Sequence, residues 1–157
     1  MSNGLPAAAH RQLYPVTVVQ RVVAAMERIP YWVVAFSARV FPAAVFWQSG
    51  ETKVAGWHLT PSAIALFQSE YRLPLIDPTV AAYMSAAAEH LCPILLVIGL
   101  ATRFAGLALL LMTAVIEVFV YPGAWPTHGV WATCFLLVIA QGPGALSLDY
   151  LIARRFK

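Results

Sequence analysis

The stretch Val80–Leu100, VAAYMSAAAEHLCPILLVIGL, decides the fold of this chain. It is long enough to cross a bilayer, because about 20 apolar helical residues span the roughly 30 Å hydrocarbon layer. Glu89 and His90 nevertheless lie in its middle. An ionisable group at that depth costs at least about 2.5 kcal/mol on insertion scales. Another polar group of the chain must therefore contact Glu89.

The composition is that of an integral membrane protein. The 157 residues are 61% hydrophobic and only 11% charged, whereas soluble domains carry about 25% charged residues. A soluble chain this short could not bury so much apolar surface. We therefore expect residues 1–157 to form a single membrane domain.

Four apolar segments predict an all-α, integral membrane four-helix bundle. The second and third are separated by only three residues, which forces them to be antiparallel neighbours. The predicted spans are Tyr31–Trp47, Thr79–Leu100, Phe104–Tyr121 and Thr127–Gln141.

Shorter helices are predicted around this bundle. Leu13–Ile29 has apolar residues at helical spacing and predicts an amphipathic helix at the membrane surface, within an N-terminal segment 1–30. Thr60 and Pro61 form an N-cap and first-turn pair, which predicts a short helix in the long polar connection Gly50–Asp77. Ser147 is placed to cap a last short helix, Leu148–Arg155. The bundle is expected over 31–150, followed by a basic tail, 151–157.

Lys and Arg flank the apolar runs, which indicates membrane orientation rather than nucleic-acid binding. The loops on one side contain most of them, so the N- and C-termini are predicted to face the cytoplasm. This side has Arg11, Arg21, Arg28, Arg103, Arg154, Arg155 and Lys157, and the other has Lys53 and Arg72.

Arg39 in the first span is the predicted partner of Glu89. It lies about eight residues from the cytoplasmic start of its span, and Glu89 lies about eleven residues from the cytoplasmic end of its own, so both should be near the midplane. A buried Arg39–Glu89 ion pair would lock the bundle, or it would form a proton relay or the polar end of a ligand site. His90 points about 100° away and is predicted to bond a neighbouring helix.

A second polar cluster is predicted at the outer face. Lys53, His58, Glu117 and His128 form the candidate ligand site, with Glu51 as a secondary polar residue. A carboxylate, two histidines and a lysine suit a quinone head group, while the alternative is ordinary interfacial hydrogen bonding. The histidine spacing matches no metal motif, so no metal site is predicted. Cys92 and Cys134 are expected to pack as small apolar residues.

In order and spacing, several short pieces together resemble the DoxX family of small four-span bacterial membrane proteins. The resemblance covers Tyr31–Tyr150. Its pieces are Arg39, Gly50-Glu51-Thr52-Lys53, Ala88-Glu89, the Gly-Leu-x-Thr-Arg turn at 99–103, and the closing Gly-x-Gly-x-x-Ser-x-Asp stretch at 142–149.

The resemblance implies a multi-pass protein of the bacterial inner membrane. The family's founding member resembles a subunit of a thiosulfate:quinone oxidoreductase, and other members are tied to redox or thiol stress. It therefore implies an accessory subunit supporting redox chemistry, with a quinone as the candidate cofactor and a soluble or membrane redox partner. Catalytic residues are not assigned, and whether the chain is itself an enzyme stays open, as does its oligomeric state. The alternatives are a small transporter or a metal- or proton-binding protein, and a structural assembly factor.

Overall fold

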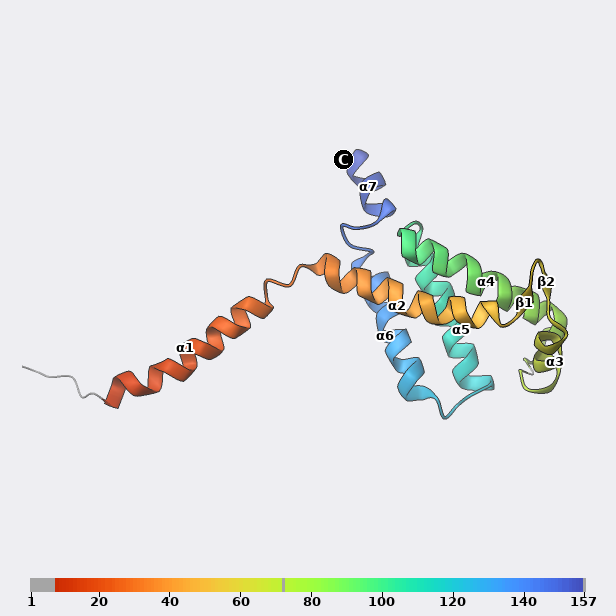
Figure 1. The fold of residues 1–157 in the computed structure, drawn as a ribbon, viewed down its shortest axis with the longest axis horizontal. Coiled ribbons are helices and arrows are strands. Elements are labelled where there is room, and N and C mark those ends of the chain that lie inside the picture. The colour runs from red at the N-terminus through yellow and green to blue at the C-terminus, as the bar shows by residue number, and fades with distance from the viewer. Residues whose placement is uncertain (1–7, 72, 157) are drawn as a thin grey trace, which may run out of the picture. The chain divides into compact units, whose positions relative to one another are not determined.

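The computed structural model describes residues 8–71 and 73–156, with side chains from Val16 onward. Over these residues the chain is almost entirely helical, as predicted, and contains one short hairpin (Figure 1). The elements are α1 (Ala8–Met26), α2 (Tyr31–Glu51), β1 (Val54–Ala55), β2 (His58–Leu59), α3 (Pro61–Ser69), α4 (Pro78–Ile98), α5 (Thr102–Phe119), α6 (Trp125–Gln141) and α7 (Leu148–Arg155).

The chain divides into two compact units, Met1–Tyr31 and Trp32–Lys157. The first contains α1, the amphipathic helix predicted over Leu13–Ile29. Its described apolar side chains, such as Val19 and Met26, are exposed within that unit. An apolar helix surface of this kind suits the membrane interface.

The second unit is the predicted four-helix bundle, made by α2, α4, α5 and α6. Its core is small and apolar, and each of the four helices contributes to it. The core residues are Ala43 and Phe46 of α2, Cys92 and Leu96 of α4, Ala105 and Leu109 of α5, and Phe135 of α6. Large apolar side chains such as Phe41, Leu91 and Phe104 point outward, as expected for helices surrounded by lipid.

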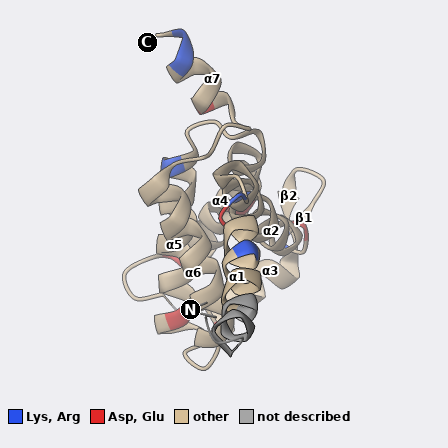
Figure 2. Ribbon diagram, turned by 90° about the vertical axis from the view of Figure 1, so that its left-hand side faces the viewer, with Lys and Arg blue, Asp and Glu red and all other residues tan. Residues whose placement is uncertain are grey.

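Two described helices, α4 and α5, are each long and apolar enough to cross a membrane. A third candidate consists of Val16–Met26 and Tyr31–Glu51 taken as one bent pair. α2 alone contains Arg39 and Glu51 and is less apolar, and α6 has only 17 residues. The packing of four helices therefore matches the prediction, whereas four separate crossings remain a prediction. Most charges of this unit lie near helix ends (Figure 2).

The connection between α2 and α4 covers one end of the bundle, which we call the α3 end. It contains an antiparallel hairpin that the sequence analysis did not predict, with Val54 opposite Leu59. The predicted helix follows as α3, and its N-cap is Thr60, whose hydroxyl accepts from the Ala63 N–H at 3.1 Å. Phe67 of α3 packs on α4 among small residues, which fixes α3 against the bundle.

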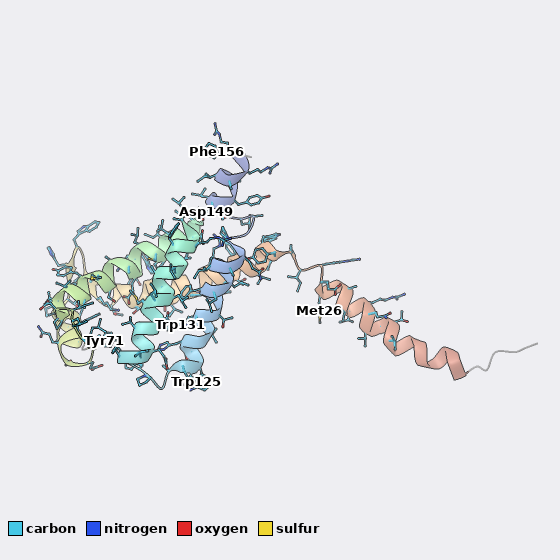
Figure 3. The ribbon with its side chains drawn as sticks, turned by 180° about the vertical axis from the view of Figure 1, so that it is seen from behind. Met26, Tyr71, Trp125, Trp131, Asp149 and Phe156 are labelled. Carbon is cyan, nitrogen blue, oxygen red and sulfur yellow. The ribbon has the colours of Figure 1, made fainter. Side chains whose placement is uncertain are left out.

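The opposite end, the α7 end, is closed by Asp149. Its carboxylate accepts hydrogen bonds from the Ala101 N–H (2.8 Å) and from the N–H and hydroxyl of Thr102 (2.8 and 2.7 Å). Its own N–H donates to the Gly99 carbonyl at 2.8 Å. Asp149 lies in the first turn of α7, beside the α4–α5 turn (Figure 3). Two stretches far apart in sequence, 99–103 and 142–149, therefore hold each other.

The Asp149 carboxyl has a lowered pKa. Burial by itself would raise the pKa, but the hydrogen bonds from Thr102 and Ala101 and the charge of Arg39 outweigh burial. A lowered pKa means that the folded state favours the carboxylate. This stabilisation is present above the unfolded-state pKa and is lost as the pH falls through the folded-state pKa.

We predict that Asp149→Asn destabilises the protein by about 1.5–3 kcal/mol near neutral pH, the range for hydrogen bonds to charged groups. The amide of Asn offers one acceptor where two N–H groups and a hydroxyl converge. The measurement is the unfolding midpoint of the full chain in detergent. The loss should shrink as the pH falls below about 4. Glu51→Gln, at an exposed carboxylate, is the control, and an equal effect of both changes would contradict the prediction.

Candidate functional site

The partner of Glu89 is Lys53. The Nζ atom of Lys53 lies 2.7 Å from Oε2 of Glu89, and the two residues are only 5% and 2% exposed. The other carboxylate oxygen, Oε1, accepts from the hydroxyl of Ser85 at 3.2 Å and lies 3.4 Å from that of Ser49. The ammonium also donates to the hydroxyl and the carbonyl of Ser49. Both buried charges are therefore compensated.

The prediction that Glu89 pairs with Arg39 was wrong, because Glu89 pairs with Lys53. Arg39 is fully buried, but its guanidinium donates to the carbonyls of Leu96 (3.1 Å) and Leu146 (2.5 Å) at the α7 end. Leu96 lies almost two helical turns from Glu89 along α4. The two charges predicted to neutralise each other thus have separate partners.

The reason is the register of α2 against α4. A Cβ at Gly50 would lie 3.1 Å from Cβ of Glu89 and 2.8 Å from the His90 ring, so Gly50 is level with this pair. Arg39 is eleven residues, or about 16 Å, back along α2. The prediction placed the cytoplasmic ends of the two spans at the same height along the bundle. In the structure, α2 begins well beyond the height at which α4 ends. Lys53 lies just past the end of α2, and its long side chain brings a positive charge to Glu89.

Glu117 and His128, both predicted for the ligand site, do contact each other. Nδ1 of His128 lies 2.5 Å from Oε2 of Glu117, across the turn that joins α5 to α6. His128 is 7% exposed, and the side chain of Glu117 is 26% exposed. The His128 ring also packs against Trp131 at 5.1 Å between centroids. This pair thus links the bundle interior to its surface.

Two cavities border Glu89. One, of about 270 Å³, lies between α3, α4 and α5, and its wall is mostly apolar. We call it the α3 cavity; Lys53, Ser85 and Glu89 are polar residues in its wall, and Phe67, Met84 and Ile116 are apolar ones. The other, the central cavity of about 180 Å³, is lined by Ser49, Tyr71, Glu89, Tyr121, His128 and Trp131, among others. Glu89 and His128 therefore face a common space.

The remaining predicted residues lie elsewhere. His58 is exposed on the hairpin and Glu51 is exposed at the end of α2, so neither lines these two cavities. His90 is half-buried on α4, with Nδ1 2.7 Å from the Ala86 carbonyl and its ring against Trp47. The prediction was that the His90 ring forms a hydrogen bond with a neighbouring helix. In the structure its hydrogen-bond partner lies on α4 itself.

Sequence reasoning missed four hydroxyl groups of this site. Ser49 and Ser85 contact Glu89. Tyr71 follows α3 (Figure 3), and its hydroxyl lies 3.4 Å from that of Tyr121. Burial and the hydrogen bond with Tyr121 raise the pKa of Tyr71, which therefore stays a neutral hydroxyl. Ser85 is four residues before Glu89, and this helical spacing indicated a small neighbour but not its hydrogen bond to the carboxylate.

Among residues 8–71 and 73–156, no group of three or more His, Cys, Asp or Glu side chains is placed to hold a metal ion. What the site offers is a compensated ion pair, hydroxyl groups and a histidine around two cavities. Such groups can hydrogen-bond a polar head group and exchange protons.

We predict strong coupling between Lys53 and Glu89 in a double-mutant cycle. Removing one partner leaves a buried charge and should cost about 3–5 kcal/mol. Lys53→Met with Glu89→Leu should recover most of that loss. Arg39→Met with Glu89→Leu is the matched control and should be additive within about 0.5 kcal/mol. Unfolding free energies in mixed micelles test this, and coupling of Glu89 to Arg39 rather than Lys53 would contradict the structure.

The family comparison covers the same helices. No curated protein and no solved structure matches the chain significantly. The family model of DoxX matches residues 34–122, which is more than half of the chain and includes Arg39, Lys53, Glu89 and Glu117. The chain therefore belongs to the DoxX family.

Proposed function

We propose that this protein binds the head group of a quinone in the α3 cavity and acts as an accessory membrane subunit for a redox partner. The observation that carries the proposal is the buried Lys53–Glu89 pair at the wall of a cavity that is otherwise mostly apolar. Pockets for small organic ligands have this character, with apolar walls and a few placed polar groups. A quinone combines two carbonyls with an apolar ring and tail.

Ser49 is the donor best placed for a quinone carbonyl. The three N–H groups of Lys53 already contact Glu89 and Ser49. The Ser49 hydroxyl is 3.4 Å from Glu89, a long hydrogen bond that is lost at little cost. Ser49 also lines the α3 cavity. We infer that its hydroxyl turns to the ligand while Lys53 and Glu89 stay paired.

The access route supports a ligand that arrives from the bilayer. Met84 and Ile76 line the α3 cavity and are 59% and 40% exposed. Apolar side chains at a cavity mouth in a membrane protein face lipid, where a quinone is dissolved. The tail of the quinone would leave the cavity past these residues. The electrons would come from a soluble or membrane partner.

We further propose that the protein lies in the bacterial inner membrane with its α7 end in the cytoplasm. Arg103, Arg154 and Arg155 lie at this end, and the positive-inside rule places such clusters on the cytoplasmic side (Figure 2). Lys53 is at the opposite end but is buried in its ion pair. The α3 cavity would then open toward the outer leaflet.

Quinone binding predicts a rise in melting temperature when a short-chain quinone analogue is added to the purified full chain. Met84→Trp, which fills the cavity mouth, should remove most of this rise without lowering the melting temperature of the free protein. Tyr83→Trp is the matched control, because Tyr83 is next to Met84 in sequence and is exposed but does not line the cavity.

Two results would refute the binding proposal. One is the absence of any quinone in mass spectra of the purified protein together with no shift by the analogue. The other is an equal response of Met84→Trp and Tyr83→Trp. A structural assembly factor predicts the first result. A metal transporter predicts metal uptake in vesicles that Glu89→Gln abolishes.

The orientation is tested by labelling with a thiol reagent that cannot cross the membrane. Trp57 at the hairpin is 98% exposed, and Phe156 at the α7 end is 83% exposed. In a background without Cys92 and Cys134, Trp57→Cys should react in intact spheroplasts. Phe156→Cys should react only after the membrane is opened. The reverse pattern would place the α3 end in the cytoplasm.

A further inference from the structure

Two ionisable side chains of the bundle each line two separate hollows. Glu89 lies in the walls of both the α3 cavity and the central cavity. His128 lies in the walls of both the central cavity and a third hollow of about 340 Å³, which we call the α5–α6 groove. Glu117 also lines this groove. Glu89 and His128 thus each border two of the three hollows.

We propose that these residues form a proton path from the α3 cavity to the α5–α6 groove. Its order is Glu89, the central cavity, His128 and Glu117. It deepens the proposed function, because reduction of a quinone consumes protons at the ligand and oxidation of a quinol releases them there. Proton exchange along the path itself needs no ligand and no electron transfer.

The chemistry of each step balances. The Glu89 carboxylate first takes up a proton at the α3 cavity, while Lys53 keeps its hydrogen bonds to Ser49. That proton then leaves the carboxyl group of Glu89, crosses water in the central cavity and binds Nε2 of the neutral imidazole of His128. The imidazolium then gives its Nδ1 proton to the Glu117 carboxylate, which lies 2.5 Å away. Glu117 releases that proton to water at the groove, where its side chain is 26% exposed. Uptake follows the same steps in reverse.

The central cavity has the size and polarity that a water link needs. Its volume of about 180 Å³ has room for several molecules, since one buried water requires only about 10–15 Å³ by this kind of measure. Ser49, Tyr71 and Tyr121 add hydroxyl groups to its wall. Buried water needs two to four polar partners, and these side chains supply them between Glu89 and His128.

Other ionisable groups surround the path without interrupting it. Lys53 contacts Glu89 from the segment after α2 at 2.7 Å. The Tyr121 hydroxyl follows α5 and contacts the hydroxyl of Tyr71 at 3.4 Å and the Glu70 carboxylate at 3.5 Å. His90 is on α4 as well, but its ring packs against Trp47 and lines neither the central cavity nor the groove.

The experiment follows the protonation of Glu89 by infrared spectroscopy after a pH jump, using the full chain in detergent without any quinone. The carboxyl band that Glu89→Gln removes is assigned to Glu89. His128→Gln should slow its appearance at least about tenfold, since a positioned proton-transfer group contributes about 10²–10⁴-fold in rate. Glu117→Gln should slow it as well. His90→Gln, a half-buried histidine next to Glu89, is the matched control and should behave as the unchanged protein does.

Equal rates in His128→Gln and His90→Gln would overturn the proton path, and so would a protein in which Glu89 shows no exchange. If His128→Gln does not fold, Glu117→Gln decides alone. Quinone binding is measured separately on the same samples by melting temperature. Binding with unchanged rates would refute only the path. Slowed rates without binding would refute only the proposed ligand.

Discussion

The ion pair of Lys53 with Glu89 is the interaction on which the arrangement of this bundle depends. A carboxylate in the middle of an apolar helix is tolerated only with a close partner, because its transfer out of water costs several kcal/mol. Here the partner follows α2 directly, so the end of α2 must come close to α4. Gly50 permits this approach, since a Cβ there would overlap the His90 ring and crowd Glu89. The hairpin and α3 then carry the chain back over the same end.

The closing of the other end follows from a similar constraint. Arg39 is fully buried and uses backbone carbonyls as acceptors, one on α4 and one just before α7. Its neighbour Gly99 has φ +72 and no room for a Cβ beside Ser147. Asp149 then satisfies the N–H groups that begin α5. The two family motifs at 99–103 and 142–149 are therefore one structural unit, in which each supplies the other's missing hydrogen-bond partners.

The sequence predicted the helices well and the polar contacts only in part. Hydropathy and capping residues gave the bundle, α3 and α7, because each depends on neighbours in sequence, as with Thr60 and Ser147. Glu117 and His128 were predicted only as members of one ligand site, and the structure adds that they contact each other across a short turn. The partner of Glu89 was not predicted correctly, because it depends on how far α2 slides along α4, and no local pattern encodes that offset. The hairpin was missed because two residues per strand leave no periodicity to read.

The buried charges at the two ends of the bundle differ in their surroundings. Those at the α7 end are structural, whereas Glu89 at the α3 end is a candidate functional residue. Arg39 and Asp149 form hydrogen bonds with backbone groups around them, and neither lines the α3 cavity or the central cavity. Glu89 is just as well bonded, yet it borders two cavities. Packing alone would favour filling that space, because empty volume next to a buried ion pair loses contacts and invites water. Glu89 thus combines a compensated charge with a position at the wall of two cavities, and this favours the α3 end over the α7 end as the place to test for ligand binding.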